Sequence, residues 1–201
     1  MLRTLFYSII NTIIPPRGRE AVLLKLTLDD LAALRQQDGL PYHDPRVTSL
    51  VWELKYRAHP KAAALAGALL SEELMDIASE ELGKPLLIPV PMHPERRRER
   101  GHNQTEVLCE AALAHVKESY EYAPGLLERV RLTAPQQTLA RASRLRSVKN
   151  SMRVSAPAQA QDRVCVVVDD VMTTGATLRE AERALKRAGA RRVYTLALAT
   201  S

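Results

Sequence analysis

The sequence predicts an α/β protein built on a doubly wound, mostly parallel sheet with helices on both faces. Residues 163–168 (RVCVVV) are continuously apolar rather than alternating, which is typical of a strand covered on both faces. Residues 192–199 form a second such strand, and between the two the apolar side chains from Leu178 to Ala188 recur at helical spacing. Gly189 is placed to end this helix. A strand, a helix and a strand of these lengths make a βαβ unit, whose crossover is right-handed.

The composition bounds the size and class of the protein. A chain of 201 residues with 46% hydrophobic and 26% charged residues is typical of one globular domain with a small helical appendage. We expect the N-terminal appendage in residues 1–46 and the main domain in residues 47–201. The net charge of +6 favours anionic partners such as phosphates or nucleic acid, whereas the aromatic content of 4% argues against base-stacking platforms. The two cysteines, Cys109 and Cys165, fit buried thiols and cannot build a cysteine zinc site, so we expect no zinc site.

The N-terminal appendage is predicted to be mostly helical. Residues 2–14 carry apolar side chains at helical spacing but are too short and too polar to span a bilayer. We therefore expect a helix that docks on the body of the protein or on a partner, no membrane span, and a cytoplasmic protein. Residues 21–26 could form a strand. Thr27 or Asp29 could cap a short helix that runs through Leu34.

The next part of the chain is predicted to contain two helices and a strand. Residues 48–58 and 61–82 have helical apolar spacing, and Gly83 is placed to end the second helix. Residues 85–91 (PLLIPVP) are typical of a buried strand that ends in prolines.

A further helix is predicted to begin at Asn103, which with Glu106 resembles a capping box, and to run to about residue 119. Residues 126–132 could form a strand. Residues 135–152 are polar and arginine-rich, which predicts a helix or a mobile loop, and residues 155–162 predict a loop.

Two adjacent acids and a hydroxyl-rich turn lie in residues 166–177 (VVVDDVMTTGAT). Asp169 and Asp170 stand where the strand is predicted to end, and in a doubly wound sheet ligands bind outside the carboxyl ends of the strands. The turn at residues 173–175 precedes a helix, whose unpaired N–H groups and partial positive charge favour phosphate. Gly175 lets the backbone approach such a ligand closely. The arrangement suits a ribose 5-phosphate.

Other interpretations of this string are weaker. A P-loop needs the lysine of G-x-x-x-x-G-K-[ST], and no lysine follows Gly175. A dinucleotide-binding fingerprint needs three glycines, and this segment has one. The acids could instead cap the helix while the threonines close the turn, which is the common case for an isolated DD or TTG. The complete ordered string favours a phosphate site.

The string VVVDDVMTTGAT resembles the signature with which type I phosphoribosyltransferases bind 5-phosphoribosyl 1-pyrophosphate (PRPP). The resemblance implies that Asp169 and Asp170, the expected catalytic residues, hold the ribose hydroxyls directly or through Mg²⁺, the expected cofactor. The residues that it assigns to the PRPP ribose-phosphate loop are Val171, Met172, Thr173, Thr174, Gly175, Ala176 and Thr177.

A narrower resemblance extends from about residue 50 onward. Residues 88–104 (IPVPMHPERRRERGHNQ) are similar to the P-V-P…R-G-[FH]-N-Q block of ComF-like proteins, the competence-associated homologues of phosphoribosyltransferases. A helix with Lys55 precedes the block, and an arginine- and glutamine-bearing segment at residues 131–150 follows it, in the order that this family shows. ComF-like proteins commonly carry an N-terminal zinc ribbon. Its cysteines are missing here, so residues 1–46 are either a remnant of the ribbon or a replacement for it.

The resemblance also suggests further ligand-binding residues. The candidates for contacts with pyrophosphate, or for a lid over the site, are Lys55, Arg100, Asn103, Gln104, Arg131 and Arg141. Structural alternatives stay open for two groups: the stem of Lys55 could simply pack on its helix, and residues 96–98 could only solvate the surface.

These expectations describe a Mg²⁺-dependent, phosphoribosyltransferase-like protein that binds PRPP and is linked to natural competence and DNA uptake. Its acceptor would be a nucleobase or another nitrogen nucleophile, which the sequence does not identify. The alternative is a non-catalytic accessory protein of DNA uptake, one that senses PRPP, binds single-stranded DNA or docks on DNA-uptake proteins.

Overall fold

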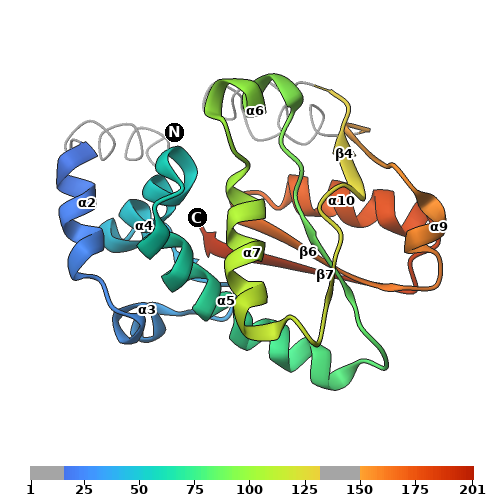
Figure 1. Ribbon diagram of the computed structural model, residues 1–201, viewed down its shortest axis with the longest axis horizontal. Helices are drawn as coiled ribbons and strands as arrows, with labels where there is room; N and C mark the ends of the chain where they lie inside the picture. The colour runs from blue at the N-terminus through green and yellow to red at the C-terminus, as the bar shows by residue number, and fades with distance from the viewer. Residues whose placement is uncertain (1–15, 132–149) are drawn as a thin grey trace.

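A computed structural model of the protein describes residues 16–131 and 150–201. In chain order, its helices and strands are α2 (Pro16–Lys25), α3 (Leu28–Leu34), β1 (Leu40–Pro41), α4 (Pro45–Arg57), α5 (Pro60–Glu80), β2 (Leu86–Pro89), α6 (Pro94–Arg100), α7 (Gln104–Val116), β3 (Glu121–Tyr122), β4 (Leu127–Arg129), β5 (Met152–Val154), α9 (Pro157–Ala160), β6 (Val164–Met172), α10 (Ala176–Arg187) and β7 (Arg192–Thr200). Figure 1 shows the last of these, β7, ending near the middle of the molecule, between α7 and the α2–α4 pair.

The main sheet confirms the predicted α/β class. Its five strands lie in the order β1-β7-β6-β2-β3, and every neighbouring pair is parallel. From β2 the chain continues to β3 on one side of the sheet, whereas from β6 it continues through α10 to β7 on the other side. The order of the strands therefore reverses between β2 and β6, and the crevice at that point is where doubly wound sheets bind ligands.

Helices cover both faces of this sheet, as the sequence predicts. Along β6, Val166 and Val168 belong to a buried cluster that includes apolar residues of α4, α5 and α7. Cys165 and Val167 point to the other face, into a second cluster that includes Leu178 and Leu185 of α10. This alternation explains why β6 is apolar at every position, since both of its faces are buried.

The helices α5 and α7 approach each other closely on the face of the sheet that Val166 and Val168 line (Figure 1). Gly67 of α5 makes the approach possible, because a Cβ built on it would lie 2.6 Å from the backbone carbon of Ala111 in α7. Any larger residue at Gly67 would therefore push the two helices apart.

The N-terminal part of the described chain is helical, and the prediction of a strand at residues 21–26 is wrong. The buried side chains of this segment are Arg19, Leu23 and Leu26, at positions i, i+4 and i+7, which is the spacing of one helix face. Thr27 caps α3 as predicted, in a capping box with Asp30. The helix predicted at residues 2–14 lies outside the described residues.

Strand β1 joins this N-terminal part to the main sheet. Leu40 pairs with Ala199 of β7, and the Tyr42 amide donates to the Thr200 carbonyl at 2.8 Å. Leu31 and Leu40 belong to the same buried cluster as Val166 and Val168. The boundary at residue 46 between an appendage and a main domain stays a prediction.

Three predicted boundaries are wrong. Helix α5 ends at Glu80, and Gly83, with φ of +84°, lies in the bend after it. Residues 155–162 are not only a loop, since Pro157–Ala160 form the short helix α9. The predicted strand at residues 126–132 is shortened to β4, which pairs with β5 in a separate antiparallel ribbon outside the main sheet.

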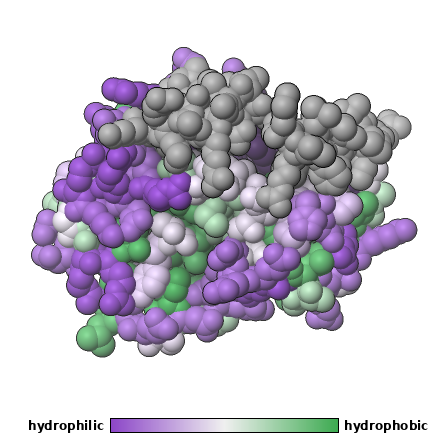
Figure 2. All heavy atoms as spheres, turned by 180° about the vertical axis from the view of Figure 1, so that it is seen from behind, coloured by the Kyte–Doolittle hydropathy of each residue, from purple (hydrophilic) through white to green (hydrophobic). Residues whose placement is uncertain are grey.

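The exterior of the described chain is mainly hydrophilic. From behind, charged and polar residues cover most of the face outside the grey residues, and apolar residues appear as small separate areas (Figure 2). Within residues 16–131 and 150–201, no helix combines the length and the apolar character that crossing a membrane requires. The predicted cytoplasmic location stays a prediction.

Candidate functional site

The paired acids lie within strand β6 rather than after it, which corrects the predicted end of this strand. Strand β2 ends at Pro89, opposite Val168, whereas β6 continues beside β7 until Met172. Asp169 and Asp170 therefore lie on a step, beyond the end of one neighbouring strand and alongside the other. This step is at the carboxyl edge of the sheet, between β2 and β6, where the strand order reverses.

Both carboxylates are almost fully buried, with exposed fractions of 8% for Asp169 and 7% for Asp170. One oxygen of each is held by the next backbone amide: Asp169 Oδ1 accepts from Asp170 N and Asp170 Oδ1 accepts from Val171 N, both at 2.9 Å. The other oxygen of Asp170, Oδ2, is buried and has no hydrogen-bond partner among the described residues. A buried acceptor without a donor is costly, so this atom points to a missing partner.

The charge of this pair is poorly compensated. Burial, followed by the neighbouring charge of Asp170, raises the pKa of Asp169 well above its usual range, and the Arg129 guanidinium opposes this rise only in part. A hydroxyl donor or a cation at the step would relieve both the desolvation and the repulsion.

The step fits a divalent cation such as Mg²⁺. Carboxylate oxygens are its preferred ligands, and Asp170 Oδ2 offers one that the fold does not use. No group of three or more histidines, cysteines and acids able to hold a metal occurs among the described residues. Mg²⁺ is usually held by one or two carboxylates together with phosphates of its substrate, and Asp169 and Asp170 would supply the carboxylates.

The turn after β6 has the geometry of an anion site. Gly175 adopts the left-handed conformation, with φ of +68°, and α10 begins at the next residue. The first turn of α10 carries no acidic residue that would satisfy its amides. The Ala176 amide has only a long contact, 3.4 Å, with Thr174 Oγ1. The N-terminus of α10 thus presents N–H groups and a partial positive charge close to the two acids.

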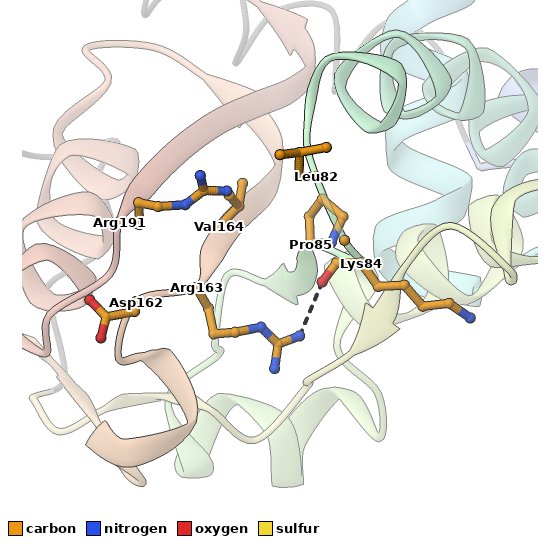
Figure 3. A pocket seen from close by; sticks show the side chains of 8 residues that line it. Leu82, Lys84, Pro85, Asp162, Arg163, Val164 and Arg191 are labelled. Carbon is orange, nitrogen blue, oxygen red and sulfur yellow. Dashed lines mark hydrogen bonds between the residues drawn. The ribbon is translucent and has the colours of Figure 1, made fainter.

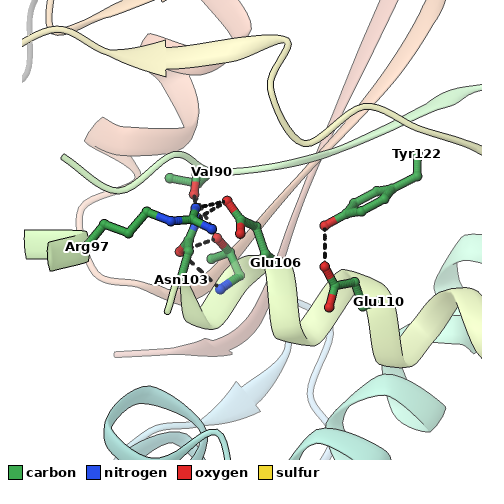
Figure 4. A network of polar contacts seen from close by, with 7 residues as sticks. Val90, Arg97, Asn103, Glu106, Glu110 and Tyr122 are labelled. Carbon is green, nitrogen blue, oxygen red and sulfur yellow. Dashed lines mark hydrogen bonds and ion pairs between the residues drawn. The ribbon is translucent and has the colours of Figure 1, made fainter. Parts of the chain in front are cut away.

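The segment after β2 is fixed to the rest of the site by hydrogen bonds. The Val90 amide donates to the Val168 carbonyl at 2.8 Å. The Val90 carbonyl accepts from Asn103 Nδ2 at 3.1 Å and from Thr105 Oγ1 at 2.7 Å. Figure 4 shows this network, with Arg97 and Glu106 in an ion pair beside it.

The structure places the predicted candidate Asn103 inside the fold. Its side chain is buried and caps α7 by accepting from the Thr105 amide at 3.3 Å. The predicted cap is confirmed, but the reciprocal half of a capping box is missing, because Glu106 accepts from the side-chain amide of Asn103 at 3.4 Å and not from its backbone.

Three other candidates gather where α4 meets the junction of α6 and α7. Arg100 Nη1 donates to Gln104 Oε1 at 2.7 Å, and its guanidinium lies 5.1 Å from the centre of the Tyr56 ring. The ammonium of Lys55 lies 5.9 Å from the same ring. The His102 ring bonds the Leu54 carbonyl at 3.2 Å, which holds the junction against α4. These side chains therefore form a cationic group around an exposed tyrosine.

Two lid candidates remain, Arg131 and Arg141. Arg131 is exposed just after β4. Arg141 lies outside the described residues, as does most of the predicted lid segment.

Arg129 is a residue of this site that the sequence alone does not single out. It lies on β4, and its Nε donates to the Pro91 carbonyl at 3.0 Å, just beyond the end of β2. Burial lowers its pKa, and the nearby charge of Asp169 raises it. The signal in the sequence is weak: Arg129 is one of two arginines in residues 126–132, a segment predicted only as a strand.

A hollow of about 340 Å³ lies at the opposite edge of the sheet, where β6 and β7 begin (Figure 3). Its arginines are already partnered. Arg163 donates to the Lys84 carbonyl at 3.0 Å and pairs with Glu121 at 2.7 Å, while Arg191 pairs with Glu81 at 3.1 Å. The arginines of this hollow are therefore already engaged within the fold, whereas the buried acids at the carboxyl edge are only partly compensated.

Comparisons with known proteins agree with the resemblance. A family model described as the phosphoribosyl transferase domain matches residues 107–201. The chain is 39% identical over 160 residues to the DNA utilization protein YhgH of Salmonella typhi, covering 78% of this chain and 68% of that protein. The Escherichia coli K12 protein of the same name is 34% identical over 156 residues, covering 77% and 67%. Competence protein F of Haemophilus influenzae is 32% identical over 115 residues, covering 56% and 49%.

Two solved structures also align with parts of this chain. The allosteric regulatory enzyme of purine biosynthesis aligns with a TM-score of 0.41 and 20% identity, over 74% of this chain and 30% of that one. Hypoxanthine phosphoribosyl transferase of Trypanosoma cruzi aligns with a TM-score of 0.42 and 12% identity, over 75% of each chain. On the evidence of the curated relatives and the family model, the chain belongs to the ComF-like family of type I phosphoribosyltransferase-fold proteins.

Proposed function

We propose that this protein binds PRPP with Mg²⁺ at the carboxyl edge of its sheet and transfers the phosphoribosyl group to a nitrogen nucleophile. The observation that carries the proposal is the pairing of two features on consecutive elements. The buried carboxylates of Asp169 and Asp170 leave Oδ2 of Asp170 without a partner among the described residues, and the turn before α10, whose first helical turn carries no acid, follows directly. A ribose with a 5-phosphate offers hydroxyls to the first and a dianion to the second.

In the proposed reaction, the bond from the anomeric carbon to pyrophosphate breaks and a bond to the nitrogen of the acceptor forms, with loss of a proton from that nitrogen. Asp169 and Asp170 hold the ribose hydroxyls and offset the positive charge that develops on the sugar. The turn at residues 173–175 fixes the 5-phosphate. Mg²⁺, held by these carboxylates and the ligand, would offset the negative charge on the departing pyrophosphate. The acceptor is a nucleobase or another nitrogen compound.

The biological setting of the proposal comes from the curated relatives. Their names refer to DNA utilization and to competence, and the chain covers 68% of the first of them. We infer that this protein serves DNA uptake or the use of the DNA taken up, in the cytoplasm. A phosphoribosyltransferase could act there on bases that are released from such DNA.

Calorimetric titration with PRPP, in the presence and absence of Mg²⁺, tests the proposal. The wild-type protein should bind PRPP more tightly with Mg²⁺. Asp170→Asn should weaken that binding at least about tenfold, because it removes a charge-assisted contact to a buried group. Asp162→Asn, which changes an exposed aspartate on the opposite edge of the sheet, is the matched control and should leave binding unchanged. A folded Asp170→Asn protein with wild-type affinity would rule out the assignment.

Binding of single-stranded DNA is a second candidate, favoured by one observation. Tyr56 is 50% exposed, and the guanidinium of Arg100 lies 5.1 Å from its ring centre. An aromatic ring flanked by cations is the kind of surface on which unpaired bases stack. The low aromatic content argued against such a platform, but Trp52 and Tyr56 lie together on α4, with ring centres 5.0 Å apart.

Competition distinguishes the two candidates. PRPP with Mg²⁺ should displace single-stranded DNA if both use Arg100 and the turn at residues 173–175, and should leave DNA bound if DNA uses another face. The affinity for DNA should also fall with salt by about 0.7 log unit per log unit for each phosphate contacted. Tight binding of DNA with no detectable affinity for PRPP would favour the second candidate.

A further inference from the structure

The side chain of Arg179 lies over the phosphate turn. Arg179 follows Gly175 by four residues in α10, and helical side chains lean toward the N-terminus of their helix, so its guanidinium reaches back across the first turn. Its Nη2 donates to the Thr174 carbonyl. A Cβ built on Gly175 would lie 2.8 Å from its Nη1, which shows how closely the guanidinium covers the turn.

No carboxylate of the described residues compensates the charge of Arg179. Farther along α10, Arg183 pairs with Glu180, and Lys186 pairs with Glu182 at 2.6 Å. Arg179 has no ion pair with any carboxylate of the described residues, and the first turn of α10 carries no acid. A cation at this end of a helix is disfavoured by the helix dipole, and an anion beside it would offset this effect.

A second observation indicates that a ligand belongs at this turn. Asp170, five residues before Gly175, is 7% exposed and has a buried oxygen without a hydrogen-bond partner. The strand–turn–helix unit thus has two groups of opposite charge whose interactions are incomplete among the described residues. Asp170 Oδ2 lacks a hydrogen-bond donor or a cation, and the Arg179 guanidinium lacks an anion. A ligand with hydroxyls at one end and a phosphate at the other satisfies both.

We propose that Arg179 is a phosphate-binding residue of this site and that it gives the site its selectivity for phosphorylated over unphosphorylated sugars. The inference rests on the proposed function. The planar guanidinium can donate two parallel hydrogen bonds to phosphate oxygens, whereas the amides of α10 approach them from the other side. Binding of the ligand would then exchange the contact with the Thr174 carbonyl for a stronger one with the dianion.

The test compares three ligands against three variants by calorimetry. The ligands are PRPP with Mg²⁺, ribose 5-phosphate and inorganic pyrophosphate. Arg179→Gln should weaken binding of the two sugar phosphates about tenfold, at the lower end of the range for a charge-assisted contact because the residue is exposed, and should leave pyrophosphate binding unchanged. Arg179→Lys keeps the positive charge but not the planar guanidinium, so it should lose less affinity for the sugar phosphates than Arg179→Gln does. Arg187→Gln, an exposed arginine in the last turn of α10, is the matched control and should change none of the affinities.

Two outcomes would overturn the inference alone: wild-type affinity of Arg179→Gln for ribose 5-phosphate, or an equal loss for pyrophosphate, which would indicate a general electrostatic effect. Failure of the wild-type protein to bind either sugar phosphate would overturn the proposed function and this inference with it. Melting curves without ligand show whether each variant is folded, and the exposed positions of Arg179 and Arg187 predict that all three are.

Discussion

Replacing Asp169 by asparagine should stabilise the ligand-free protein while it impairs ligand binding. The Asp169 carboxylate is 8% exposed, and burial and the Asp170 charge both disfavour its ionised form. Asparagine keeps the Oδ1 acceptor for the Asp170 amide, a contact of 2.9 Å, and removes one of two adjacent charges. The two acids thus lower the stability of the ligand-free protein while they enable ligand binding, as is common at functional sites.

The size and pH dependence of the effect follow from the same contacts. Leaving a buried polar group poorly compensated costs about 1–3 kcal/mol. The variant also loses the attraction between Asp169 and Arg129, so we expect a net gain of about 1–2 kcal/mol, or a rise in melting temperature of roughly 2–8 °C for a chain of this size. Because the pKa of Asp169 is raised in the folded protein, the unfolded chain releases this proton first as the pH rises. Asp169 therefore lowers the stability of the wild type above about pH 4, the usual carboxyl pKa, and the variant lacks this contribution.

Thermal melting between pH 4 and pH 8, without Mg²⁺ or PRPP, measures this difference. The advantage of Asp169→Asn should be smallest at the acidic end, which lies near the carboxyl pKa of the unfolded chain, and should grow with pH. Asp162→Asn, at an exposed aspartate, should show no such trend. An Asp169→Asn protein that is no more stable than the wild type at pH 8 would refute the reasoning.

Two further predictions concern packing and the loop after β2. Gly67→Ala should lower the free energy of unfolding by about 1–3 kcal/mol in denaturant unfolding, because the added Cβ would lie 2.6 Å from the Ala111 backbone. Gly125→Ala is the control and should have little effect, because nothing lies within 4 Å of a Cβ at that position. Equal losses of stability in the two variants would contradict this account. Arg129→Gln should weaken binding of PRPP in titration, because the Pro91 carbonyl loses its 3.0 Å contact; unchanged affinity would show that Arg129 does not position the loop.

The last βαβ unit could be predicted because its signals are local. The apolar run of β6 and the helical spacing of α10 each lie within one element, and Gly189, with φ of +87°, ends α10 as expected. The extension of β6 through Asp169 and Asp170 could not be predicted, because it depends on pairing with Ala197 and Ala199 of β7, which lie much later in the chain. Two acids after an apolar run otherwise predict the end of a strand.

The motif of the site could be predicted from the sequence, whereas the residues that hold the motif in place could not. All residues of the motif VVVDDVMTTGAT are contiguous, so their order and spacing are visible in the sequence. Two of the supporting contacts join segments that lie apart in the sequence: Arg129 donates to the Pro91 carbonyl, and Asn103 donates to the Val90 carbonyl. Arg179 has a sequence signal in its place four residues after Gly175, but its orientation toward the turn needs the structure.

The late position of β6 in the chain has a consequence during synthesis. This strand lies between β7 and β2, and Val166 and Val168 complete the cluster that also holds Leu74 and Leu108. A nascent chain therefore makes α5 and α7 long before the strand that covers their apolar faces leaves the ribosome. The close contact at Gly67 joins these two helices directly, so we expect them to pair before β6 is made. Such pairing would reduce the apolar surface that is exposed to chaperones and to other unfinished chains. A helix pair that forms early would then serve as the template on which the sheet closes last.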